Sequence, residues 1–326
     1  MRRGPVVTTG DLHMRRGFLA LAAAFGLVLT AAAPAAAITK NYRPDDEHLF
    51  VGLIAFYDAN WVFLHRCTAE LLSPTVALMA GHCTDDGLPA TPAGTLAAHA
   101  RAWFLQDVGS QLGPVNDPRT GYPTSCSGTL GNGLGVWCAE TSTLFNYGFD
   151  NFAGFPDIHD IGIVIFDQAI AEPEYAELAG ANTIDQLATA RGTQDVTMRV
   201  SGYGLSYRQI TPPGGGPGVG QNNTVSFRVR LQADLIFTNL SSANSGGYTL
   251  VAEGNGNDRG GTCNGDSGGP VFWPATSNQV VAVSSWGILN AGCRGVGYYY
   301  RTDRGAVLDW IHEVVGDQLW SEITVN

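Results

Sequence analysis

The stretch Gly261-Thr-Cys-Asn-Gly-Asp-Ser-Gly-Gly-Pro270 decides how this chain is interpreted. Its serine, Ser267, is surrounded by small residues, which let a backbone turn tightly and let another molecule approach closely. A serine hydroxyl becomes a strong nucleophile when a neighbouring base takes its proton. Backbone N–H groups in such a turn can also stabilise an oxygen that gains negative charge. The alternative is a plain glycine-rich turn, and the rest of the sequence decides between the two.

Two upstream segments supply a candidate base and a candidate acid. Leu72-Ser-Pro-Thr-Val-Ala-Leu-Met-Ala-Gly-His-Cys83 places His82 after an apolar run, and Asp157-Ile-His-Asp160 leads into a second apolar run. A neutral imidazole can take the proton of a serine hydroxyl, and a buried carboxylate orients that imidazole and stabilises its charged form. We prefer Asp160 as the acid because the apolar run starts directly after it, with Asp157 as the alternative.

These three segments resemble the motifs of one family. Gly265-Asp-Ser-Gly-Gly-Pro270 resembles the signature of the trypsin-like serine proteases, and the other two segments resemble that family's histidine and aspartate boxes. The order His, Asp, Ser is that of chymotrypsin and differs from the order in subtilisins and α/β-hydrolases. The likeness covers nearly all of residues 38–326, is weakest over an inserted loop region at 107–155, and has the style of bacterial secreted members.

The resemblance implies a fold and a reaction. The fold is all-β, with two packed antiparallel six-stranded β-barrels, an active site between them and a C-terminal α-helix. The reaction is the hydrolysis of peptide bonds through an acyl-enzyme intermediate, with Ser267 as nucleophile, His82 as base and Asp160 as acid. The N–H groups of Gly265 and Ser267 would form the oxyanion hole.

The resemblance also places residues along the substrate. The Ser285 hydroxyl would hydrogen-bond the triad carboxylate, and the strand that follows it would pair with extended substrate. The residues that contact substrate by resemblance are Gly261, Thr262, Ser285, Trp286, Gly287 and Gly297.

Substrate selectivity is expected to depend on Gly261, six residues before Ser267. In trypsins an aspartate at that position binds Arg or Lys side chains. An uncharged pocket does not offset the desolvation of a buried cation. We therefore expect no preference for cleavage after Arg or Lys, and a better fit for large apolar or aromatic side chains.

Activation in this family uses a free N-terminal Ile or Val whose ammonium pairs with the Asp before the nucleophile. Here the pair is Ile38 and Asp266, and losing one partner would leave the other charge buried alone. The segment Ile38-Thr-Lys-Asn41 departs from the usual Ile-Val-Gly-Gly. We expect signal cleavage to expose Ile38 directly, with an ordinary mature terminus or removal of a further propeptide as the alternatives.

The N-terminal residues have the organisation of an export signal. Arg15-Arg16 precedes the apolar stretch Phe18–Thr30, which is short for a membrane span, and Ala35-Ala-Ala37 forms an A-x-A cleavage site. We expect a signal peptide over 1–37, with Met14 as an alternative start. Either the general or the twin-arginine route would secrete the protein to the exterior or the periplasm. A membrane anchor is the alternative.

Charge narrows the expected partners. The chain of 326 residues has 18 basic and 29 acidic residues and a net charge of −11. That sign disfavours nonspecific binding to nucleic acid or anionic membranes. We expect a protein or peptide substrate, no cofactor, no nucleic-acid partner, no membrane partner after signal cleavage, and a monomer.

An even number of cysteines in an exported chain suggests disulfides, and six allow 15 connectivities. The resemblance pairs Cys67 with Cys83, and a bond between Cys126 and Cys138 would close a small loop. We expect no metal site, because no CxxC pair with partner histidines occurs. The six are Cys67, Cys83, Cys126, Cys138, Cys263 and Cys293.

Short apolar runs rich in β-branched and aromatic residues recur between turn signals, as in an all-β chain. Val51–Tyr57 is one such run, and Val225–Leu231 alternates as a half-buried strand does. Gly, Asn, Pro, Ser and Thr are dense over 107–155, which indicates loops. After Asp303, a candidate helix cap, apolar residues at helical spacing predict a helix over 303–316.

Three other functions compete with a general protease. A homologue that binds without catalysis is one, since a fold does not determine a function. Such proteins usually lose a triad member or the signature glycines, and here all are present. The second is an esterase, since an acyl-enzyme serine also hydrolyses esters. The third is a protease that processes one partner and uses residues 107–155 as an additional binding surface.

Overall fold

The computed structural model describes residues 38, 41–108, 120–124, 126, 138–188, 195–210, 221–226, 228–254, 259–290 and 293–326. The expected signal peptide, residues 1–37, lies outside the described residues. The chain divides into units at 1–33 and 34–326, and every described residue belongs to the second. None of the helices in these ranges has the length and apolar character needed to span a bilayer.

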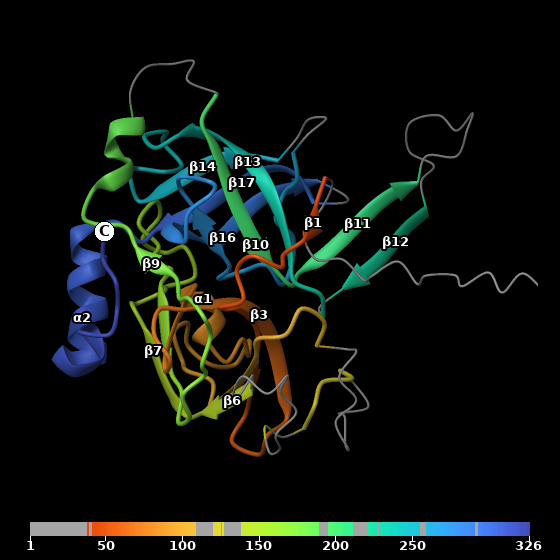
Figure 1. Cartoon of the computed structure of the whole chain (residues 1–326), viewed down its shortest axis with the longest axis vertical. Helices are drawn as coiled ribbons and strands as arrows, with labels where there is room; N and C mark the ends of the chain where they lie inside the picture. Colours follow the sequence, from red (N-terminus) through yellow and green to blue (C-terminus); the bar gives the residue numbers. More distant parts are fainter. Residues whose placement is uncertain are drawn as a thin grey trace, which may run out of the picture. The chain divides into compact units, whose positions relative to one another are not determined.

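The first part of the chain forms a seven-stranded antiparallel sheet, in the order β6-β5-β2-β3-β4-β8-β7. Figure 1 labels β3, β6 and β7 of this sheet. Every residue of β2 and β4 is buried, which suits their apolar sequences. A single helical turn, α1 (Gly81–Thr84), follows β4. The strands are β2 Val51–Tyr57, β3 Phe63–Leu71, β4 Val76–Met79, β5 His99–Trp103, β6 Cys138–Thr141, β7 Thr143–Asn146 and β8 Gly162–Ile165.

The second part forms a closed ring of six antiparallel strands, β13-β10-β15-β16-β17-β14, because β14 also pairs with β13. The strands are β10 Thr197–Gly202, β13 Leu231–Asn239, β14 Thr249–Glu253, β15 Pro270–Phe272, β16 Gln279–Asn290 and β17 Arg294–Arg301. The smaller elements are β1 Arg43–Pro44, β9 Glu177–Leu178, η1 Thr183–Leu187 and the hairpin of β11 Leu205–Ile210 and β12 Gln221–Ser226. The expected all-β fold with two barrel-like sheets and a C-terminal helix is confirmed.

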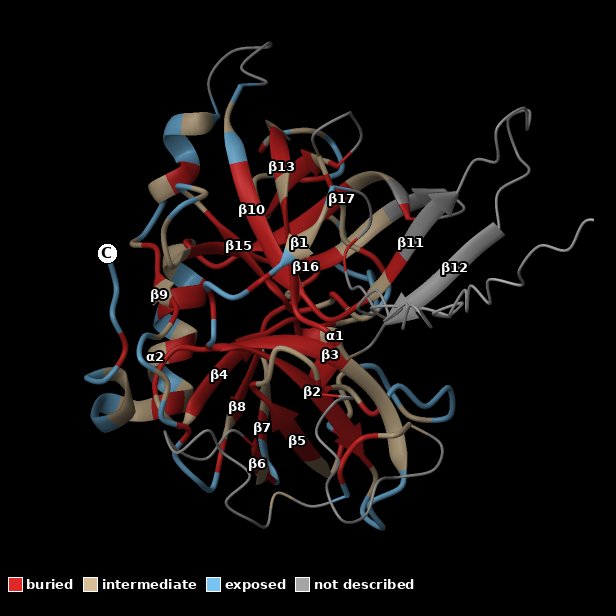
Figure 2. Cartoon of the chain, turned by 45° about the vertical axis from the view of Figure 1, so that its right-hand side comes forward, coloured by how far each residue is buried: buried red, intermediate tan, exposed pale blue. Residues whose placement is uncertain are grey.

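The apolar core has two clusters. The larger holds the buried residues of the first sheet together with Phe272, Val283 and Tyr300 of the second, and the smaller lies within the second sheet. Buried residues are red in Figure 2. Helix α2 (Gly305–Trp320) adds Val307, Ile311 and Val315 to the core of the first sheet, as its helical spacing predicts. The regular geometry of α2 breaks at Gly316, with φ 74° and ψ 165°, and the helix then resumes.

The expected helix cap is not used. Asp303 lies before α2, but its buried carboxylate accepts hydrogen bonds from Arg301 and from the N–H of Ile184. A buried arginine needs such a partner more than a helix end does, because an unpaired buried charge is costly.

Two local predictions are wrong. The loop predicted over 107–155 contains β6 and β7, whose short pairings at the sheet edges outweigh a turn-rich composition. The strand predicted over 225–231 is broken, since β12 ends at Ser226 and β13 begins at Leu231. Between them the fully buried Arg230 donates to backbone carbonyls instead of extending a strand.

Candidate active site

Strand pairing brings His82 and Asp160 together. Antiparallel β4 and β8 pair in the register Met79↔Gly162, so the end of β4 meets the start of β8. His82 follows β4 on α1, and Asp160 lies just before β8. A Cβ on Gly162 would come 2.9 Å from the carbonyl oxygen of Ala80, which explains a glycine at this close approach.

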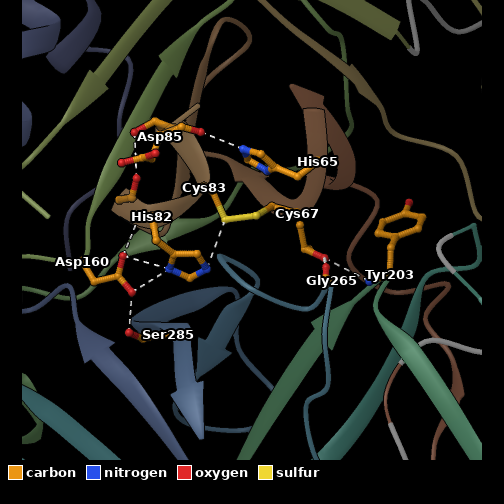
Figure 3. Close-up of a disulfide and its surroundings, with 12 residues drawn as sticks. His65, Cys67, His82, Cys83, Asp85, Asp160, Tyr203, Gly265 and Ser285 are labelled. Carbon is orange, nitrogen blue, oxygen red and sulfur yellow. Dashed lines mark hydrogen bonds and ion pairs between the residues drawn. A yellow bond between two sulfur atoms is a disulfide. The ribbon is translucent and has the colours of Figure 1, made fainter. Parts of the chain in front are cut away.

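The imidazole of His82 is held by the carboxylate of Asp160 (Figure 3). Nδ1 of His82 lies 2.9 Å from Oδ2 of Asp160, and the backbone N–H of His82 donates to Oδ1 at 2.8 Å. The hydroxyl of Ser285, on β16, also donates to Asp160. The carboxylate is buried, whereas 28% of the His82 side chain is exposed, so Nε2 remains available to a reacting group.

The pKa values of Asp160 and His82 shift in opposite directions, which favours a charged imidazole beside an ionised carboxylate. Burial alone would raise the pKa of Asp160, but the charge and hydrogen bond of His82 outweigh it and hold that pKa below its usual value. Burial alone would lower the pKa of His82, but the charge and hydrogen bond of Asp160 raise it above its usual value. His82 is therefore a base that gains strength from Asp160.

Asp157 has different partners. Its carboxylate accepts a hydrogen bond from the hydroxyl of Tyr300 at 2.5 Å, and it lies 3.6 Å from Nε2 of His159. Of the two candidate acids, the geometry therefore places Asp160 and not Asp157 beside His82.

The loop that carries Ser267 lies against the strands of both sheets. The N–H of Thr68, on β3, donates to the Ser267 carbonyl at 2.9 Å, and the N–H of Gly268 donates to Ser284 on β16 at 2.7 Å. A Cβ on Gly268 would lie 2.9 Å from the nitrogen of Ala80, close to His82, and its φ is +81°. This glycine lets the loop approach the His82 segment.

The N–H groups of Gly265 and Ser267 have no internal acceptor within the described part of the chain, although those of Asp266, Gly268 and Gly269 are all bonded. Gly265 has φ +95°, a conformation that favours glycine. Two unpaired donors on either side of Asp266 suit a developing oxyanion.

The Ser267 hydroxyl is not hydrogen-bonded to His82. Among the described residues, the polar atom in contact with Nε2 of His82 is the sulfur of Cys83, at the long distance of 3.9 Å (Figure 3). Catalytic hydrogen bonds are often long in proteins without substrate and tighten when substrate binds.

Ile38 and Asp266, the expected activation pair, are both completely buried and in contact. The Asp266 carboxylate accepts hydrogen bonds from the N–H groups of Gly204 at 2.7 Å, Cys263 at 2.8 Å and Ile38. Burial nevertheless raises the pKa of Asp266 to about 7, despite these donors. Among the described residues, no cation contributes to lowering the pKa of this carboxylate.

Of the residues expected to contact substrate, Gly261, Thr262 and Gly297 meet around one small cavity, whereas Ser285, Trp286 and Gly287 do not line it. A cavity of about 10 Å³ is bounded by Gly254, Gly261, Thr262, Cys293, Gly295, Gly297 and Tyr299. That volume suits one water and not the large apolar side chain expected from the sequence. The hydroxyls of Thr262 and Tyr299 lie 3.2 Å apart at its wall.

A larger cavity of about 500 Å³ lies beside His82 and Ser285, between residues 85–93 and the Phe149–Phe152 turn. The Phe149 ring is 5.7 Å from that of His82, and Phe152 packs edge-on against Trp286. No motif in the sequence points to Thr68, Tyr203 or these phenylalanines. The available sequence signal for Thr68 is its position directly after Cys67.

Three disulfides join the cysteines as Cys67–Cys83, Cys126–Cys138 and Cys263–Cys293, so the expected disulfides are confirmed. Cys67, His82 and Cys83 form the one close group of potential metal ligands in the described ranges. Its two sulfurs are bonded to each other, so they are not thiolate ligands.

Comparisons with known proteins support the family and the fold. A family model described as Trypsin matches residues 179–311, a range that contains Ser267 but neither His82 nor Asp160. The fibrinolytic enzyme, isozyme C, of Lumbricus rubellus is 27% identical over 233 residues, or 70% of this chain and 78% of that enzyme. A solved structure of HL collagenase has a TM-score of 0.51 at 14% identity, covering 87% of this chain and 98% of that one. The last likeness concerns the fold alone, and the other two support a trypsin-like serine protease.

Proposed function

We propose that this protein is a secreted serine endopeptidase with Ser267, His82 and Asp160 as its catalytic triad. The Ser267 oxygen attacks the substrate carbonyl carbon while His82 takes the hydroxyl proton. His82 then gives that proton to the leaving amine as the C–N bond breaks. Water hydrolyses the resulting ester by the same route, which frees the acid product and restores Ser267.

The observation that carries this proposal is the combination of a buried Asp160–His82 pair with two unpaired N–H groups around Ser267. The pair supplies a base, and the donors, those of Gly265 and Ser267, supply oxyanion stabilisation. The name of the earthworm relative, a fibrinolytic enzyme, supports a protein substrate.

The proposed selectivity excludes Arg and Lys before the cut. No Asp or Glu side chain bounds the cavity at Gly261 within the described residues, and its polar groups include the Thr262 and Tyr299 hydroxyls. A buried cation would lose its hydration there without gaining a counter-charge.

Secretion and activation are proposed to be linked. Cleavage after Ala37 would turn the Ile38 N–H, which already donates to Asp266, into an ammonium next to a buried carboxylate. That ion pair would lower the pKa of Asp266 and order the Gly265–Ser267 loop. The three disulfides suit an oxidising, extracytoplasmic compartment.

The test is a fluorophosphonate probe, which reacts with an activated serine by losing fluoride, applied to wild type, Ser267→Ala and Ser277→Ala. Ser277 is a serine whose hydroxyl donates to Pro274 in an exposed turn, so its variant is the matched control. We expect labelling and casein cleavage in wild type and in the control, and neither in Ser267→Ala. Sequencing of the casein fragments should show cuts that are not dominated by Arg or Lys.

Other outcomes identify the rival functions. If correctly processed wild-type protein is not labelled at Ser267, the protein is a binding homologue without catalysis. If the protein is labelled and hydrolyses esters but cuts no protein substrate, it is an esterase. Cuts mainly after Arg or Lys would show that the interpretation of Gly261 is wrong.

A further inference from the structure

Thr68 touches the proposed oxyanion hole from the opposite sheet. It lies on β3, directly after Cys67, and is completely buried. Its hydroxyl donates to the carbonyl of Gly265 at 2.9 Å and accepts from the N–H of Tyr203 at 3.0 Å. The direction of these bonds is unambiguous, because an N–H only donates and a carbonyl only accepts. Figure 3 shows Gly265 and Tyr203 side by side on the Cys67 side of the disulfide.

Each peptide group that leads to Ser267 has its carbonyl fixed by a different donor. The Asn264 carbonyl accepts from the N–H of Leu205 at 2.7 Å, and the Asp266 carbonyl accepts from the N–H of Gly269 at 2.9 Å. The Gly265 carbonyl, between them, is held by the Thr68 hydroxyl. This is the one side-chain hydrogen bond to these three carbonyls among the described residues.

Gly265 needs such a restraint more than its neighbours do. It has no side chain, and its φ of +95° lies in a region that glycine leaves easily. Rotation about Gly265 would turn its N–H away from the reacting oxygen. The hydroxyl also ties Gly265 to Tyr203, in the segment whose Leu205 holds Asn264.

We propose that Thr68 is a positioning residue. Its hydroxyl fixes the peptide that joins Gly265 to Asp266. By limiting rotation about the backbone torsions of Gly265, it also fixes the direction of the Gly265 N–H, one donor of the oxyanion hole. The inference rests on the proposed function, since it assigns Thr68 to the same reaction. Thr68 touches neither His82 nor Asp160 through any hydrogen bond, so it should influence oxyanion stabilisation and not the base.

The experiment compares Thr68→Val, Thr68→Ser and wild type in mature protein. The readout is the rate of fluorophosphonate labelling as a function of pH. In Thr68→Val the plateau rate should fall about 10-fold or more, since complete loss of one donor costs about 10²–10³-fold. The apparent pKa of the profile, which reports His82, should stay unchanged. Thr68→Ser keeps the hydroxyl and should recover most of the rate.

Thr302→Val is the matched control, because Thr302 is also completely buried and its hydroxyl donates to a backbone carbonyl, that of Val280, at 3.1 Å. It should lose stability as Thr68→Val does, yet keep the plateau rate. If Thr68→Val does not fold, Thr68→Ala replaces it, because the smaller side chain leaves room for water on the Tyr203 N–H. The plateau labelling rate of Thr68→Ala is expected to fall by the same factor.

Several results would overturn the inference. A folded valine or alanine variant with the wild-type plateau shows that the hydroxyl does not position the loop. The same conclusion follows if folded Thr68→Ser does not recover the labelling rate, or if the plateau rate of Thr302→Val falls equally. A shift in the apparent pKa of the labelling profile would place the effect on His82 instead of on the oxyanion hole. Absence of labelling in wild type is different, because the proposed function then fails and the inference falls with it.

Discussion

At the scale of single residues, burial changes what a side chain can do. Asp160 and Glu70 are both buried carboxyl groups. Asp160 accepts hydrogen bonds from His82 and Ser285 and is held ionised. Neither oxygen of Glu70 has a hydrogen-bond partner in the described structure, and burial raises its pKa well above the usual value. Asp160 can stabilise a charged imidazole, whereas burial without a partner favours the neutral form of Glu70.

Replacing Glu70 should therefore stabilise the protein, and increasingly so as the pH rises. The folded pKa of Glu70 lies above its unfolded value, so the folded state loses stability as the pH rises through this interval. Glu70→Met removes that loss and an unpaired polar group of the kind that costs about 1–3 kcal/mol. Urea unfolding at pH 5 and pH 8 should show a larger gain at pH 8.

The control for this prediction is Glu322→Met, which alters an exposed glutamate near the C-terminus. It should change the free energy of unfolding little, and equally at both pH values. A gain in Glu70→Met that does not grow with pH would show that Glu70 is not a buried acid.

At the scale of elements, strand pairing and glycine geometry determine where side chains meet. The β4–β8 register places His82 beside Asp160, and Gly268 lets the serine loop approach Ala80. In α2 the same kind of geometry shapes the helix, since Gly316 adopts φ 74° and ψ 165°, a combination essentially restricted to glycine. The helix therefore ends its regular part at Gly316.

Gly316→Ala should destabilise the protein by about 1–3 kcal/mol through backbone strain alone. A Cβ at Gly316 would meet no atom within 4 Å, so no steric clash contributes. Gly305→Ala is the matched control, since a Cβ there also meets nothing within 4 Å and its φ is not in the left-handed region. The control should be neutral or slightly stabilising in urea unfolding. Equal effects of the two variants would argue against strain at Gly316.

At the scale of the whole molecule, a few buried contacts join the two sheets. Arg230, before β13, donates to the carbonyls of Leu49 and Val51 near the start of the first sheet. Thr68 and Ser267 make a similar contact at the site itself. Ile38, far from the site in sequence, reaches Asp266. The proposed catalytic loop thus depends on contacts from two distant parts of the chain, at Thr68 and Ile38.

The Ile38–Asp266 contact predicts that the mature protein begins at Ile38. N-terminal sequencing of secreted protein should find Ile38, and a different mature end would contradict the proposed activation. A form that starts at Ile38 should label faster with fluorophosphonate than a form that keeps Ala37, because only the first has its ammonium at Asp266. Ile38→Val at the mature terminus keeps that ammonium and is the matched control.

The same pair predicts a pH dependence. Without the ammonium, the pKa of Asp266 rises from 3.8 to about 7, so stability is lost as the pH increases through that range. With the ammonium, Asp266 stays ionised and the loss disappears. The form that starts at Ile38 should therefore exceed the Ala37 form in stability by more at pH 8 than at pH 5. An equal difference at both pH values would show that the ammonium is not paired with Asp266.

The sequence by itself determined the features that depend on neighbouring residues. The segment around Ser267, the segment that ends at His82 and the period of the C-terminal helix are local patterns, and the all-β fold follows from short apolar runs. Local propensity misjudged β6, β7 and the break at Arg230, because pairing and buried partners outweigh it there.

Only the tertiary structure decided which distant groups meet. It placed Asp160 beside His82 and Asp157 beside Tyr300, although the two acids are three residues apart. It brought Thr68 to Gly265, gave the Glu70 carboxyl no hydrogen-bond partner among the described residues, and left a cavity of about 10 Å³ at Gly261. The physical reason is that hydrogen bonding, burial and cavity volume depend on strand register and packing between sheets, which no single segment of sequence contains.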